Sequence, residues 1–148
     1  MPTFTIPLTP VGASVQAVIT PSSTDEKSEG RELSIRGILD TGAAFTVIDN
    51  SVVQLLGLKP VEKQLIHGIT TGAKPVPGDI YRINVRIYAP GTNELGYCVR
   101  NIMAYGGDLF RVWVDGHQAM FGRDVLQNCL FTYNGVLQTF SLAYGGQG

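Results

Sequence analysis

Several features that decide the class of a protein are missing from this sequence. No apolar stretch among its 148 residues approaches the roughly 20 residues that a helix needs to cross a bilayer. The opening residues, MPTFTIPLTP, lack a basic start followed by an apolar core, so we expect no signal peptide and a cytoplasmic location. The net charge of −1 gives no electrostatic reason to expect a nucleic acid or a membrane as a partner.

Cysteine and histidine are scarce as well. Cys98 and Cys129 do not have the spacing of metal ligands, so we expect reduced thiols in the core. The two histidines, His67 and His117, are too few to suggest a metal site. We expect His117 to lie in a surface loop, and we expect neither a metal nor a cofactor.

Glycine and proline, by contrast, are abundant. The chain has 18 Gly and 8 Pro between short β-branched and aromatic runs, a pattern that predicts many strands and tight turns. A chain of 148 residues that is 44% hydrophobic can bury a real core, and it shows no internal repeat and no second domain. We predict one domain over residues 1–148 that is mainly β and barrel-like, with one or two short helices.

The hydrophobic pattern places the strands along the chain. Residues 3–20 fit one or two strands, the polar run 21–31 fits an exposed loop, and residues 32–39 fit a strand that buries alternate side chains. Residues 64–88 fit a long hairpin whose turn lies in HGITTGAKPVPG. Further strands are expected at 96–104 and 109–114.

Local signals predict two short helices and a second hairpin. In DNSVVQLLGLKP, Asn50 or Ser51 is the expected N-cap of a helix of about two turns that ends at Gly57. Another short helix is expected at 123–128. Asn134-Gly135 is a strong signal for a two-residue type I′ turn between strands.

The segment GILDTGAAFTVID, residues 37–49, carries a candidate catalytic group. Asp40 follows a buried strand, and Gly42 permits a turn and leaves room for a substrate backbone. Peptide hydrolysis needs one group that takes a proton from water and another that protonates the amide. Two aspartates in contact supply both groups, because like charges so close together share one proton.

The count of this motif bears on how such a pair could form. DTG occurs once in the chain and DSG does not occur, so the second carboxylate of a pair must be Asp40 of another copy. The alternative is that Asp40 only ends a strand, because Asp and Gly favour turns.

A second motif far downstream makes the assignment more specific than the first motif alone would allow. LDTGA at residues 39–43 and MFGRDVL at residues 120–126 together resemble the retropepsin family, the retroviral-type aspartic proteases and their cellular and bacterial single-domain relatives. The resemblance covers residues 32–142 or so. It implies a homodimeric acid-protease fold, a closed or partly open β-barrel.

The resemblance also implies a role for each motif residue. Asp40 would be catalytic, Thr41 would interlock with its mate across the dimer axis, and Gly42 would receive hydrogen bonds from the substrate backbone. The implied substrate-binding residues are Gly42, Ala43 and Ala44, with His67, Gly68, Ile69 and Thr70 from a flap in the 64–88 hairpin. The implied structural support beside the catalytic turn comes from Phe121, Gly122, Arg123 and Asp124. An exposed hairpin position without a role is the alternative for His67.

The sequence departs from the viral pattern at three places. Ala44 stands where the retroviral enzymes carry an acidic residue that pairs with the later arginine, so Arg123 is expected to use Asp124 or a carbonyl across the interface, and the subsite there to be less polar. The expected flap lacks the dense glycine tip of the viral enzymes. Extra residues at both ends mean that the dimer sheet of the family, made from chain termini, cannot be carried over directly.

These observations lead to one main functional hypothesis and two alternatives. The main hypothesis is a homodimeric aspartic endopeptidase that binds peptide or protein substrates and hydrolyses peptide bonds without a metal or a covalent intermediate. One alternative is the same fold used as a peptide-binding or dimerisation module with weak or no turnover. The other is that the chain is one segment of a longer protein.

Overall fold

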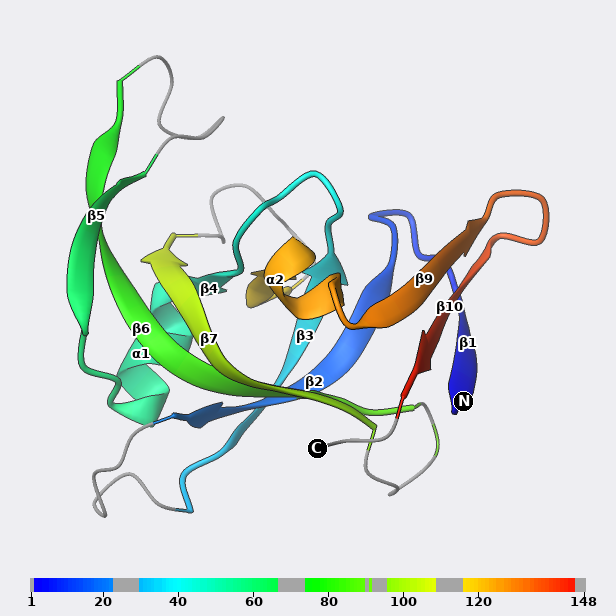
Figure 1. Cartoon of the computed structure of the whole chain (residues 1–148), viewed down its shortest axis with the longest axis horizontal. Coiled ribbons are helices and arrows are strands. Elements are labelled where there is room, and N and C mark those ends of the chain that lie inside the picture. Colours follow the sequence, from blue (N-terminus) through cyan, green and yellow to red (C-terminus); the bar gives the residue numbers. More distant parts are fainter. Residues whose placement is uncertain are drawn as a thin grey trace.

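The computed structural model describes most of the chain and shows a β-barrel with a small sheet beside it (Figure 1). The described residues are 2–22, 30–66, 74–89, 91, 96–108 and 116–145. The strand expected at 109–114 lies outside them, as does most of the loop expected at 21–31.

Six strands form the barrel in the order β2-β3-β8-β4-β7-β6, and a pairing between β2 and β6 closes it. A further strand, β5, pairs with β6 outside the ring as the antiparallel hairpin that the sequence predicts. The prediction of a mainly β, barrel-like fold with short helices is therefore confirmed. The strands are β2 (Ser14–Pro21), β3 (Leu33–Leu39), β4 (Val47–Asp49), β5 (Glu62–Ile66), β6 (Val76–Ile87), β7 (Tyr97–Gly107) and β8 (Ala119–Phe121).

Strand β3 brings the two sequence motifs together. Ile35 and Leu39 alternate into the core as predicted, and Ile38 is buried as well. Strand β3 lies between β2 and β8, and its pairing with β8 is parallel, with Leu39 opposite Phe121. Because parallel strands end at the same edge of a sheet, the residues that follow Leu39 and Phe121 leave the barrel side by side.

At Gly37 the backbone of β3 lies very close to the side chain of Phe121. A Cβ atom at Gly37 would lie 2.3 Å from Cε2 of Phe121, whose side chain is fully buried and cannot move aside. We expect Gly37→Ala to lower the free energy of unfolding by about 1–3 kcal/mol through overpacking. Gly107→Ala is the matched control, because its Cβ would meet Val47 Cγ1 at an ordinary 3.5 Å. Urea denaturation compares the two, and equal stabilities of the two variants would contradict this packing argument.

Helix α1 (Asn50–Leu56) confirms the first predicted helix but not its N-cap. The cap is Asp49, rather than Asn50 or Ser51, and its carboxylate accepts a hydrogen bond from Ser51 N at 2.9 Å. The reason is that β4 runs through Asp49, so the last extended residue carries the capping side chain. Gly57 ends the helix as predicted, with φ at 61° in the left-handed region.

Helix α2 (Arg123–Leu126) is shorter than the predicted 123–128, because the chain already enters a strand at Cys129. The hydroxyl of Tyr97 donates a 2.6 Å hydrogen bond to the carbonyl of Val125 and so ties α2 to β7. Burial raises the pKa of Tyr97 to about 12, which keeps this hydroxyl protonated and able to donate. Neither described helix has the length and apolar character needed to cross a membrane.

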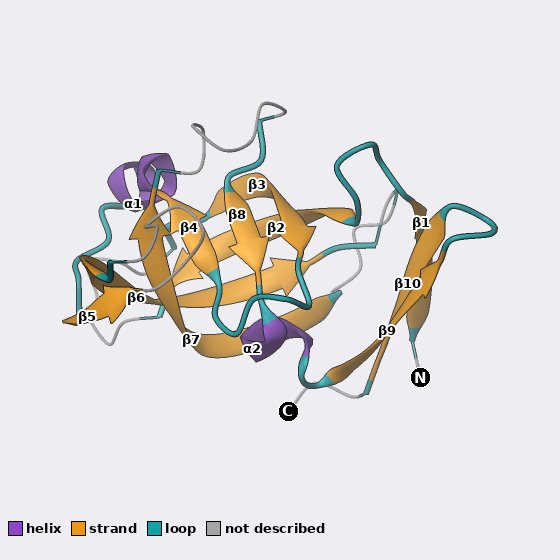
Figure 2. Ribbon diagram, turned by 90° about the horizontal axis from the view of Figure 1, so that it is seen from above, coloured by secondary structure: helices purple, strands orange, loops and turns teal. Residues whose placement is uncertain are grey.

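A three-stranded antiparallel sheet stands apart from the barrel on the side away from β5 (Figures 1 and 2). It joins both ends of the described chain in the order β1-β10-β9. Phe4, Phe140 and Leu142 on its inner face are buried and belong to the same core as the barrel strands. The strands are β1 (Thr3–Pro7), β9 (Cys129–Asn134) and β10 (Thr139–Tyr144).

The turn between β9 and β10 corrects the sequence prediction. The hairpin is present, but Asn134 pairs with Thr139, so the connection has four residues and is not a type I′ turn at Asn134-Gly135. The side chain of Asn134 accepts a hydrogen bond from Leu137 N at 3.0 Å, which stabilises the longer loop. The left-handed residue is Gln138, with φ at 55°.

His117 and the cysteines also differ from expectation. His117 is 1% exposed rather than in a surface loop, and its Nε2 lies 2.8 Å from Ser14 Oγ. Residues 116–118 lead straight into β8, and the spacing of His117 with Ala119 and Phe121 places all three on alternate, buried positions. Cys98 and Cys129 are half-buried rather than in the core, and burial raises the pKa of both thiols.

Candidate active site

Asp40 begins a compact turn at the end of β3, here called the DTG turn (residues 40–46). The backbone N–H of Asp40 donates to the carbonyl of Phe121 at 2.8 Å, which fixes the start of the turn against β8. The side chain bends back, and its Oδ1 accepts a hydrogen bond from Gly42 N at 2.8 Å. Asp40 is half-buried, whereas Thr41 and Gly42 are exposed. The carboxylate is therefore oriented by its own turn and faces an accessible surface.

Gly122 lets helix α2 begin directly against this turn. A Cβ atom at Gly122 would lie 2.8 Å from the carbonyl oxygens of both Ala43 and Phe45. The following residue, Arg123, donates its backbone N–H to the carbonyl of Ala43 at 2.8 Å. Only a residue without a side chain allows this close approach, which explains the glycine between Phe121 and Arg123 in the second motif.

The side chain of Arg123 holds the same turn from a second direction. Its Nη1 donates to the carbonyl of Thr41 at 2.8 Å. The acceptor within the chain is thus a backbone carbonyl of the DTG turn rather than Asp124, while the expected contact across a dimer interface stays a prediction. With Ala44 in the place of an acidic partner, the guanidinium binds the backbone of the turn instead.

Asp124 pairs with Thr46 at the far end of the turn. Its carboxylate accepts hydrogen bonds from Thr46 N at 2.9 Å and from Thr46 Oγ1 at 2.7 Å. Thr46 is fully buried, and its Oγ1 also accepts a hydrogen bond from Gly122 N at 3.3 Å. Gly122, Arg123 and Asp124, here called the brace, thus hold the DTG turn at Thr41, Ala43 and Thr46.

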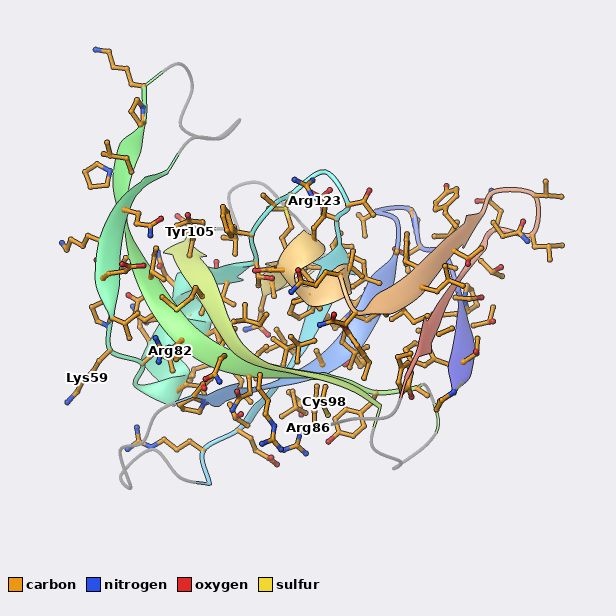
Figure 3. The ribbon with its side chains drawn as sticks, in the orientation of Figure 1. Lys59, Arg82, Arg86, Cys98, Tyr105 and Arg123 are labelled. Carbon is orange, nitrogen blue, oxygen red and sulfur yellow. The ribbon has the colours of Figure 1, made fainter. Side chains whose placement is uncertain are left out.

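An aromatic pair beside the turn was not predicted from the sequence. Phe45 is 53% exposed and packs edge-to-face on Tyr105, with ring centroids 5.6 Å apart. The hydroxyl of Tyr105 donates to Gln64 Oε1 on β5 at 3.2 Å. Figure 3 places Tyr105 and Arg123 at the same end of the barrel. The DTG turn, the end of β7 and the β5–β6 hairpin are therefore linked by contacts on one side of the molecule.

The structure brings most of the predicted site residues together. Asp40, Thr41, Gly42, Ala43 and Ala44 form one turn, with Phe121, Gly122, Arg123 and Asp124 packed or hydrogen-bonded beside it. The expected flap residues His67, Gly68, Ile69 and Thr70 lie outside the described residues. Within the described ranges, no group of three or more His, Cys, Asp or Glu side chains could hold a metal ion.

Comparison with known proteins agrees with this geometry. Residues 27–89, which contain the DTG turn, match the aspartyl protease family. The fold matches the crystal structure of a retropepsin-like aspartic protease from Rickettsia conorii with a TM-score of 0.60 at 15% identity, covering 97% of this chain and 91% of that one. The chain therefore has the retropepsin-like fold, and residues 27–89 match the aspartyl protease family.

The match to the Rickettsia conorii protein shows that the two chains share the fold over nearly their whole length. In this chain the shared fold includes α2 and the terminal sheet, which lie outside the residues 27–89 that match the family. A looser match is to an aspartic proteinase from Irpex lacteus, with a TM-score of 0.47 at 17% identity, covering 97% of this chain and 47% of that one. No curated protein matches the sequence.

Proposed function

We propose that this retropepsin-like chain is an aspartic endopeptidase that acts as a homodimer, with one Asp40 contributed by each copy. The observation that carries the proposal is the DTG turn itself. A half-buried carboxylate, oriented by its hydrogen bond from Gly42 N, follows a core strand. The brace holds the surrounding backbone at Thr41, Ala43 and Thr46. A peptide-binding module has no need for a carboxylate held in this way.

The proposed mechanism uses the two carboxylates as one acid–base unit. Water between them loses a proton to the ionised Asp40 and attacks the scissile carbonyl carbon, while the protonated Asp40 polarises the carbonyl oxygen. The proton then passes to the leaving nitrogen as the C–N bond breaks. Because the pair shares one proton, activity should peak at mildly acidic pH and fall on either side of the peak.

The proposed substrate is a peptide in extended conformation. It would lie between the DTG turn and the β5–β6 hairpin, so that backbone hydrogen bonds give affinity and side-chain pockets give preference. Gly42, Ala43 and Ala44 would form the floor of this groove. The hairpin tip would form a flap, with His67, Gly68, Ile69 and Thr70 as its proposed contacts.

The test of the proposal is cleavage of a mixed peptide library by the purified chain from about pH 4 to 7. Cleavage that a transition-state-mimic inhibitor of aspartic proteases blocks would support it, because such a mimic binds the reacting geometry rather than the ground state. Binding of peptides without products at any pH would contradict it.

We expect Phe45 to set which substrate side chains the subsite beside the turn prefers. Its exposed ring, backed by Tyr105, offers an apolar wall to a substrate side chain. We expect Phe45→Ala to lower kcat/KM about 10-fold for peptides with a large apolar residue at that subsite, and to spare peptides with a small one. Leu55→Ala is the control, since Leu55 is 67% exposed on α1 and belongs neither to the DTG turn nor to the β5–β6 hairpin. A uniform loss across all peptides would speak against a specificity role.

A further inference from the structure

Four neighbouring strands of the barrel carry positive charge with almost no negative charge. Strands β2, β3 and β7 contain no acidic residue, and the acidic residue of β6, Asp79, forms an ion pair with Lys63 on β5. The same four strands contain four arginines, Arg36, Arg82, Arg86 and Arg100. Surfaces of soluble domains normally mix the two signs of charge. A surface of one sign favours a partner of the opposite sign.

Three of these arginines lie on the outer face of β6 and β7. Ile83 and Val85 of β6 are buried in the core, so Arg82 and Arg86 alternate outward. Arg82 and Arg100 are exposed, and Arg86 is half-buried. Among the described residues, no carboxylate pairs with any of these three guanidinium groups. Arg82, Arg86 and Arg100 are here called the arginine face.

Two members of the arginine face converge on one side chain. Arg86 lies opposite Cys98 in the pairing of β6 with β7, and Arg100 is two residues further along β7. Burial raises the pKa of the Cys98 thiol, and the charges of Arg86 and Arg100 oppose this rise, so both guanidinium groups lie near the same sulfur. Nη1 of Arg86 also donates to the hydroxyl of Tyr88 at 3.2 Å. Two cations are therefore held close together, one of them oriented by a hydrogen bond.

The backbone beside Arg100 is irregular and is held by polar side chains. The register of β6 with β7 shifts between Ile83 and Val85, and Asn101 takes a φ of 59° in the left-handed region. Asn101 N donates to Oδ1 of Asn84 at 3.1 Å, and the hydroxyl of Ser22 donates to Oδ1 of Asn101. A bulge changes the direction of the side chains next to it. This network therefore fixes the direction in which Arg100 leaves the sheet.

We propose that the arginine face docks an extended acidic segment of a partner protein. Arg82 and Arg86 are four residues apart on one strand, a separation of about 13 Å. Carboxylates four residues apart on an extended segment have the same separation, so a segment lying along β6 can meet both arginines. A guanidinium group binds a carboxylate through two parallel hydrogen bonds. Three arginines are few for a nucleic acid, whose binding depends on neutralising a run of phosphates.

The arginine face lies away from the DTG turn. Figure 3 places Arg86 and Cys98 below β6 and β7, and it places Arg123, which contacts the DTG turn, at the opposite end of the barrel. A partner docked on this face would leave the DTG turn accessible. This inference goes beyond the proposed function and does not depend on it.

Fluorescence anisotropy of a labelled peptide of alternating glutamate and serine tests the proposal. We expect Arg86→Gln and Arg100→Gln each to raise the Kd of this peptide at least about 10-fold. Arg100→Lys keeps the charge but loses the planar fork, so it should raise the Kd only about 3-fold. Lys59→Gln is the matched control, because it removes one exposed positive charge outside the four strands and should leave the Kd unchanged.

Two results would overturn the proposal. One is a Kd that the two glutamine substitutions leave unchanged, or that Lys59→Gln raises equally. The other is tighter Arg100-dependent binding of a single-stranded oligonucleotide or of anionic vesicles than of the acidic peptide. Failure of the proposed function is a separate result: a chain that binds the acidic peptide through Arg86 and Arg100 but cleaves no library peptide would overturn the endopeptidase and leave the arginine face standing.

Discussion

Asp40→Asn should reduce peptide cleavage about 10⁴-fold or more while the chain stays folded and dimeric. The substituted side chain keeps an oxygen that can accept the hydrogen bond from Gly42 N, so the DTG turn should hold its conformation. What it loses is the ability to take and give a proton. In a homodimer both members of the acid–base pair are lost at once, which makes this the largest expected effect of any single substitution.

The measurement is initial-rate cleavage of the best library peptide, with circular dichroism and sedimentation as checks of fold and assembly. Glu32→Gln is the control, because it removes one exposed carboxylate just before β3 without touching the turn. Peptide binding should survive in Asp40→Asn, since the groove is unchanged. Substantial cleavage by this variant would show that Asp40 does not carry the chemistry.

The second large effect is expected at Asp124, which touches no reacting group in the proposed mechanism. Asp124→Ala removes the acceptor for the N–H and the hydroxyl of Thr46, both in a fully buried residue. Leaving such groups unsatisfied costs about 1–3 kcal/mol each, and a turn displaced by about 1 Å can lose 10²-fold in rate. We expect kcat to fall about 10²-fold, with a smaller change in KM.

A double-mutant cycle distinguishes this positioning role from a general loss of stability. Thr46→Val keeps the volume of the side chain and removes only the hydroxyl. If Asp124 acts through Thr46, the two substitutions should be non-additive by about 1–3 kcal/mol in kcat/KM, measured well below the unfolding temperature. Strict additivity, or a fall in stability with kcat unchanged, would assign Asp124 a structural role alone.

Local sequence signals predicted a large part of this fold for identifiable reasons. The alternation of Ile35 and Leu39 indicated a half-buried strand, and Gly57 marked a helix end, because both depend on neighbours within a few positions. The DTG turn could be recognised from adjacent residues in the same way. Its environment could not be recognised from neighbouring residues and was expected only through the family resemblance, since Asp124 and Thr46 are 78 positions apart and the pairings of β8 with β3 and β4 bring them together.

The errors have physical reasons of the same kind. Asn134-Gly135 does not form the predicted two-residue turn, because the register of β9 with β10 leaves four residues between the two strands. The side chain of Asn134 stabilises this longer loop by accepting a hydrogen bond from Leu137 N. His117 looked like a loop residue because its burial depends on β2, a strand far away in the sequence. The contact between Phe45 and Tyr105 could not be predicted from the local sequence, because each residue alone fits ordinary strand packing.

The central claim is that one active site takes an Asp40 from each of two copies, and subunit mixing tests it most directly. Wild-type chain and Asp40→Asn chain are unfolded together, refolded at known ratios, and assayed for cleavage. If both carboxylates are required, activity follows the square of the wild-type fraction, so each wild-type chain in an equal mixture retains about half of its activity. Activity strictly proportional to the wild-type fraction would mean that each chain works alone, and would contradict this account.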